Sequence, residues 1–65
     1  MFRHKDYVEC IYKERSFGKA AEKLHVSQPA LSAMIKRLEK ELGAPLFNRK
    51  TTLLTLTPFG AEYLK

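Results

Sequence analysis

Apolar residues recur at three- and four-residue intervals over much of the chain, a spacing that predicts amphipathic helices. We expect a first helix from about Arg3 to Glu14 and a second, capped by Ser16, that ends near Leu24. The inward positions of these two helices are Tyr7, Val8, Cys10, Ile11 and Tyr12 in the first, and Phe17, Ala20, Ala21 and Leu24 in the second. The small alanines predict close packing of the second helix on a third, with His25 and Val26 in the turn between them.

A third helix is expected between Ser27, which can cap it, and Gly43, which can end it. Pro29 falls in its first turn, where a missing N–H does no harm. At about 100° per residue, one side collects Leu31, Met34, Ile35, Leu38 and Leu42, and the opposite side collects Pro29, Ala33, Lys36, Arg37 and Lys40. Ser32 lies at the border, and Gln28 projects from the exposed start. The water-facing side therefore begins small and neutral and ends cationic.

The residues after Gly43 change character and predict strands. Residues 44–57, which read APLFNR, KTT and LLTLT, are β-branched or apolar with partial alternation, which favours two short strands joined by a basic tip. Thr57 and Pro58 resemble a helix cap and first turn, so a fourth helix should run from there to Lys65, where it is cut short. The order of helix, helix, helix, hairpin and helix start predicts a mostly α fold of the winged helix-turn-helix class.

Length and charge favour binding over catalysis. The chain of 65 residues has room for one small domain, and three short helices do not easily enclose an active site. Twelve Lys and Arg residues against seven Asp and Glu residues give a formal charge of +5 and a pI near 9.6. This excess predicts a polyanionic partner, with nucleic acid ahead of an anionic membrane.

Other classes of site find little support in the sequence. Cys10 has no second cysteine to pair with, and neither His4 nor His25 stands at a metal-ligand spacing from it. No apolar run approaches the roughly 18 residues of a membrane span, and the first residues lack the apolar core of a signal peptide. We expect a cytoplasmic, non-enzymatic protein without metal or cofactor.

The segment from the second helix to the third has the form that the major groove of DNA admits: a short helix, a tight turn and a longer helix with an exposed polar start. Gln28 can bond to adenine through two atoms, and Ser32 can bond to several base edges. Pro29 and Ala33 can meet a thymine methyl group. The N–H groups behind Ser27 suit phosphate, as do the cations further along, which are Lys36, Arg37 and Lys40.

One further pattern spans nearly the whole chain. It consists of Ser16-Phe17, Ala20-Ala21, Leu24, residues 27–32 (SQPALS), Ile35, Leu38-Glu39, Leu42-Gly43, Leu46-Phe47, Arg49, Leu56-Thr57 and Gly60. In this order and spacing it resembles the N-terminal DNA-binding domain of LysR-type transcriptional regulators. The resemblance implies a winged helix-turn-helix domain over residues 1–57, with its recognition helix from near Gln28 and its wing around residues 49–54. It also implies that residues 58–65 begin a truncated linker helix.

The resemblance also implies partners and contact residues. Base contacts would fall on Gln28, Pro29, Ser32 and Ala33, and DNA backbone contacts on Ser27, Lys36, Arg37, Lys40, Arg49, Lys50 and Thr52. The family often places Arg where Thr52 stands, so Lys50 or Arg49 would reach the minor groove here. The implied partners are duplex DNA, further copies of the intact regulator through the linker helix, and a small-molecule inducer bound by a C-terminal domain that this sequence lacks.

Several alternatives stay open. Arg49 can pair with Glu39 or Glu41 instead of phosphate, and Gln28 and Ser32 can be capping or solvent-facing residues. The rival function is a winged-helix module that binds an acidic protein surface. A basic helix lying on a membrane fits less well, because the cations are spread over three helices and the wing without a bulky apolar face beside them.

Overall fold

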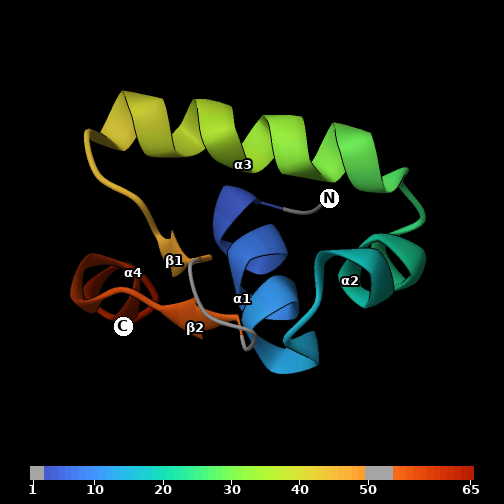
Figure 1. The fold of residues 1–65 in the computed structure, drawn as a ribbon, viewed down its shortest axis with the longest axis horizontal. Helices are drawn as coiled ribbons and strands as arrows, with labels where there is room; N and C mark the ends of the chain where they lie inside the picture. The colour runs from blue at the N-terminus through green and yellow to red at the C-terminus, as the bar shows by residue number, and fades with distance from the viewer. Residues whose placement is uncertain (1–2, 50–53) are drawn as a thin grey trace.

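The computed structural model describes residues 3–49 and 54–65. Within these ranges the elements are α1 (His4–Glu14), α2 (Phe17–Leu24), α3 (Gln28–Leu42), β1 (Phe47–Asn48), β2 (Thr55–Leu56) and α4 (Pro58–Tyr63). In Figure 1, α3 runs along one side of the molecule, with α1 and α2 on its inner side and the two strands and α4 toward its C-terminal end. The predicted order of helices and strands is confirmed.

The helix boundaries follow from local hydrogen bonds that the sequence indicates. The hydroxyl oxygens of Ser16, Ser27 and Thr57 each accept the backbone N–H three residues further on, at 3.2, 3.2 and 2.9 Å. Gly43 ends α3 with a φ of 86°, which glycine adopts without a steric penalty. His25 makes the turn between α2 and α3 with a φ of 59°, a left-handed conformation that few side chains adopt.

The core lies where α1, α2 and α3 meet. Its buried apolar side chains are Val8, Ile11, Ala20, Ala21, Leu24, Leu31, Ile35, Leu38, Leu46 and Phe47, and Cys10 packs half-buried at its edge. The prediction that Leu42 faces the core is wrong, since this residue is 38% exposed. Leu42 belongs to the last turn of α3, which extends past α1 toward the loop that leads to β1 (Figure 1).

The two strands form an antiparallel pair that is tied to α2. Phe47 lies opposite Leu56, and Asn48 lies opposite Thr55. The ring of Phe47 meets the ring of Phe17 edge to face, with centroids 5.9 Å apart, a geometry that aromatic pairs prefer. The expected basic tip of this hairpin, with Lys50 and Thr52, lies outside the described residues.

The start of α4 is held against the loop before β1. The Thr57 hydroxyl donates to the Pro45 carbonyl oxygen at 2.7 Å, and the Thr57 N–H donates to the Leu46 carbonyl oxygen at 3.0 Å. Gly60 is buried against the same loop, and a Cβ built on it would collide with the Leu46 carbonyl oxygen and crowd the Leu56 side chain. The contacts of Thr57 and Gly60 fix where α4 begins. Beyond the C-terminal end of α4, the Lys65 carbonyl oxygen accepts a hydrogen bond from the Lys5 side chain of α1 at 2.7 Å.

We predict that Gly60→Ala lowers the free energy of unfolding. The added methyl group would meet a backbone carbonyl that cannot move aside as a flexible side chain does, and such overpacking costs about 1–3 kcal/mol. Helix propensity alone predicts the opposite sign, a gain of about 1 kcal/mol for alanine over glycine. Urea unfolding followed by circular dichroism distinguishes the two.

The matched control is Ala61→Ser on the exposed neighbouring position, which should change the free energy of unfolding by no more than about 0.5 kcal/mol. If Gly60→Ala instead raises the free energy of unfolding, the close approach of α4 to Leu46 is not the reason that position 60 holds a glycine.

Candidate nucleic-acid interface

The outer face of α3 carries most of the predicted contact residues. The exposed ones are Gln28, Pro29, Ala33, Lys36, Arg37 and Lys40, while Ser32 is half-buried at the border of the face. Within the part of the chain that the structure describes, the three cations of this face form no ion pair. A row of unpaired cations on one exposed helix face is suited to an extended anionic partner.

The N-terminal end of α3 is less open to phosphate than the sequence suggested. The Ala30 N–H is already bonded to the Ser27 hydroxyl, and Pro29 has no N–H to give. The Leu31 N–H donates to the Ser27 carbonyl oxygen at 3.0 Å. At this helix end the Gln28 N–H is therefore the backbone donor left for a phosphate oxygen.

The inner side of α3 holds a carboxylate that the sequence analysis did not single out as an anchor. Glu39 is only 9% exposed. Its Oε2 accepts the Leu46 N–H at 2.6 Å and the Phe47 N–H at 3.4 Å, and its Oε1 accepts a bond from Arg49 at 3.2 Å. The signal that could have revealed it is an acidic residue directly after Leu38, four positions beyond Ile35, on the border of the apolar side. Through these bonds α3 fixes the start of the hairpin.

Arg49 pairs with Glu39, which is one of the partners that the sequence left open for it. Its guanidinium also lies over the Phe17 ring, 5.2 Å from the centroid, and its side chain is 36% exposed. A guanidinium carries five N–H donors, so this pairing leaves donors for a phosphate. The assignment of Arg49 to the DNA backbone therefore stays a prediction, as do those of Lys50 and Thr52, which lie outside the described residues.

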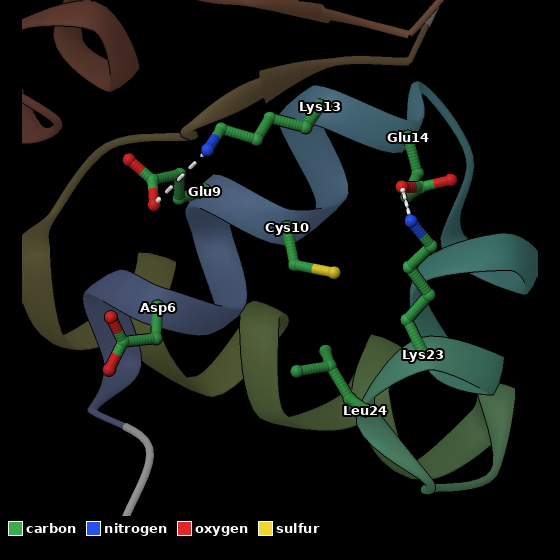
Figure 2. Close-up of a pocket in the computed structure, with 7 residues that line it drawn as sticks. All are labelled: Asp6, Glu9, Cys10, Lys13, Glu14, Lys23 and Leu24. Atoms are coloured by element: carbon green, nitrogen blue, oxygen red, sulfur yellow. Dashed lines mark ion pairs between the residues drawn. The ribbon is translucent and has the colours of Figure 1, made fainter.

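A pocket between α1 and α2 is a second place where a ligand could bind. It has a volume of about 340 Å³ and is lined by Asp6, Glu9, Cys10, Lys13, Glu14, Lys23 and Leu24. Figure 2 shows the Cys10 side chain directed into it and ion pairs on its rim, Glu9 with Lys13 at 3.8 Å and Glu14 with Lys23 at 2.9 Å. Three acidic residues against two lysines make this pocket a poor receptor for phosphate.

The pKa shifts in the pocket follow from the same contacts. Burial, assisted by the Glu14 carboxylate, raises the pKa of the Cys10 thiol, so the thiol stays protonated at neutral pH and is a weak nucleophile. The hydrogen bond and charge of Glu14 raise the pKa of Lys23, which keeps this ammonium charged. Both shifts favour the protonated forms, a neutral Cys10 thiol and a charged Lys23 ammonium. The pocket thus offers no activated nucleophile, and the outer face of α3 is the stronger candidate for a binding site.

The described ranges 3–49 and 54–65 contain neither a metal-binding cluster nor a membrane-spanning helix. No group of three or more His, Cys, Asp or Glu side chains is arranged to hold a metal ion. Among the same residues, no helix has the length and apolar character needed to cross a membrane.

Comparison with known proteins connects this geometry to one family. Residues 2–61 match the family model described as bacterial regulatory helix-turn-helix protein, lysR family. The chain is 48% identical over 60 residues to the HTH-type transcriptional regulator YcgK of Bacillus subtilis, covering 92% of this chain and 18% of that protein. It is 46% identical over 61 residues to the transcriptional regulator BudR of Klebsiella aerogenes, covering 94% and 43%. The chain thus spans less than half the length of these relatives.

Solved structures agree with the sequence relatives. A crystal structure of the BenM DNA-binding domain in complex with catB site 1 DNA superposes with a TM-score of 0.89 at 42% identity, covering 95% of this chain and 69% of that one. Full-length OxyR from Pseudomonas aeruginosa superposes with a TM-score of 0.82 at 45% identity, covering 89% and 20%. The chain has the fold of these DNA-binding domains.

We predict that Glu39→Gln destabilises the protein, whereas Glu41→Gln, the same change at an exposed position of the same helix, does not. The amide oxygen can still accept the Leu46 and Phe47 N–H groups. The amide group loses the Arg49 pair, however, and its bonds are no longer assisted by charge, which should cost about 1–2 kcal/mol. Glu41→Gln should stay within about 0.5 kcal/mol of the wild type. Urea unfolding of the three proteins in parallel gives the comparison, and equal stability of the two variants would contradict the role given to Glu39.

Proposed function

Because the chain belongs to the lysR family of bacterial regulatory helix-turn-helix proteins, we propose that it binds duplex DNA with the N-terminal half of α3 in the major groove. The observation that carries the proposal is the outer face of α3, small and neutral at its start and cationic toward its end, with all three cations unpaired among the described residues. A helix with such a face approaches the bases closely by its start and the phosphates further along.

The first turns of α3 supply the base contacts in this proposal. Gln28 bonds to a base edge through its carboxamide, and Ser32 does so through its hydroxyl from the border of the face. Pro29 and Ala33 are exposed and small, so they let the helix approach a thymine methyl group. The similarity to a domain solved in complex with DNA supports this docking.

The remaining contacts grip phosphates without reading sequence. Lys36, Arg37 and Lys40 follow the base-reading turns along the same face, and Ser27 marks the helix end, where the Gln28 N–H is unused. From the wing we assign backbone contacts to Arg49, which has spare donors beside Glu39, and to Lys50 and Thr52.

For the intact regulator we propose control of transcription through occupancy of its DNA site, without catalysis and in the cytoplasm. The relatives that this chain matches are transcriptional regulators of greater length. We assign self-association of the intact regulator to a linker helix that begins with α4, whose Phe59 is 38% exposed. A small-molecule inducer would then bind in a domain outside residues 1–65. The division of this chain into residues 1–57 and 58–65 belongs to the same proposal.

The experiment compares a base-reading residue with a phosphate-gripping one. Gln28→Ala should weaken binding to the selected site by about 1–3 kcal/mol and change binding to random duplexes little. Lys36→Ala should weaken both by similar factors and reduce the slope of log K against log salt by about 0.9. Fluorescence anisotropy with both duplexes over a salt series measures the two effects, after a selection from random duplexes has defined the preferred site.

The wild-type salt dependence is the control that separates the rival function. If three to five phosphates are neutralised, the slope should be roughly −3 to −4.5. A slope near zero would favour the module that binds an acidic protein surface instead. Equal losses from Gln28→Ala on preferred and random duplexes would overturn its assignment as a base reader.

A further inference from the structure

The Gln28 side chain rests against the first turn of α2, at Gly18. A Cβ built on Gly18 would lie 3.3 Å from Gln28 Oε1, 4.0 Å from its Cδ and 3.7 Å from the Ser16 hydroxyl. Gly18 is half-buried, whereas the Gln28 residue as a whole is exposed. The carboxamide that starts the recognition face of α3 is therefore in contact range of another helix.

The backbone of α2 does not itself call for a glycine at this position. Gly18 is the second residue of an α-helix that Ser16 caps, and among the described residues the one glycine with a positive φ is Gly43. Glycine weakens a helix relative to alanine because it loses more backbone freedom on folding. The effect of glycine at position 18 is to leave space beside α2. The atom nearest to that space is the Gln28 carboxamide oxygen.

We propose that Gly18 is a positioning residue that determines sequence specificity by letting the Gln28 side chain lie on α2 before DNA binds. This inference rests on the proposed function, in which Gln28 reads a base edge. A glutamine side chain has several rotatable bonds, and ordering it only at the moment of binding reduces affinity for the site that it reads. The contact with α2 restricts that freedom beforehand, and it favours one placement of the carboxamide at the groove.

Larger side chains at position 18 should act in proportion to their size. Alanine at 3.3 Å from Oε1 is tighter than ordinary van der Waals contact, so the carboxamide must shift by a few tenths of an ångström. Leucine would take up the space in which the carboxamide lies. Phosphate contacts from Lys36 and Lys40, further along α3, are not touched by either change.

The test is a double-mutant cycle on the 65-residue chain. Gly18→Ala and Gly18→Leu are made alone and together with Gln28→Ala. Affinities are measured for the preferred duplex, for duplexes with each base pair of the site replaced in turn, and for random duplexes. In the wild-type background, Gly18→Leu should reduce discrimination at one base pair by about fivefold or more, within the range that one bidentate contact supplies. Gly18→Ala should reduce it less.

The Gln28→Ala background and the random duplexes make the result specific. Without the Gln28 carboxamide, Gly18→Leu should have no further effect on discrimination. Random-duplex affinity should stay within about twofold, because phosphate contacts do not depend on position 18. The thermal unfolding midpoint shows whether each variant is folded. If Gly18→Leu does not fold, the comparison is made with Gly18→Ala, because alanine is a better helix former than glycine.

Two outcomes overturn the proposal while leaving the proposed function intact. One is an equal loss of discrimination from Gly18→Leu with and without Gln28, and the other is unchanged discrimination in both Gly18 variants. A wild-type chain that binds DNA with no sequence preference or salt dependence would instead reject the proposed function, and the role of Gly18 with it. The wild-type measurement is therefore made first.

Discussion

The arrangement of the interface depends on the buried carboxylate of Glu39. It is the point at which α3 holds the chain that follows it, since it accepts the N–H groups of Leu46 and Phe47 and pairs with Arg49. A carboxylate out of water is costly unless its oxygens are bonded, and here both oxygens are. The bonds face away from the outer side of α3, so Lys36, Arg37 and Lys40 take no part in fixing the hairpin, whereas Arg49, which is also assigned to DNA, does.

The short loop between α3 and β1 also positions α4. Through Leu46, this loop connects α3, the hairpin and α4. Leu46 gives its N–H to Glu39 on α3 and its carbonyl oxygen to the N–H of Thr57, and Gly60 packs against that carbonyl group. Arg49 extends the connection to α2 through the Phe17 ring. A shift of the loop at residues 43–46 would therefore move the hairpin and α4 together relative to the helix assigned to the major groove.

Features that depend on near neighbours in the sequence could be predicted, and those that depend on distant contacts could not. The caps at Ser16, Ser27 and Thr57 and the stop at Gly43 each involve residues within one helical turn. Leu42 followed the apolar periodicity of α3 yet is exposed, because periodicity does not reveal how far the neighbouring helices extend. The anchoring role of Glu39 and the close approaches of Gly18 and Gly60 join different elements of the fold, beyond the reach of one helical turn. For the candidate site, the exposed cationic face could be predicted, whereas the pairing of Arg49 with Glu39 was one of three possibilities, beside Glu41 and phosphate.

The central claim, that the outer face of α3 meets the DNA, is tested most directly by an NMR titration of the ¹⁵N-labelled chain with a preferred duplex. The account predicts the largest changes in amide chemical shift over residues 27–40, with Gln28 and Ala33 among them, and smaller changes at α1. The largest changes around the pocket formed by Asp6, Cys10 and Lys23, with α3 little affected, would contradict it.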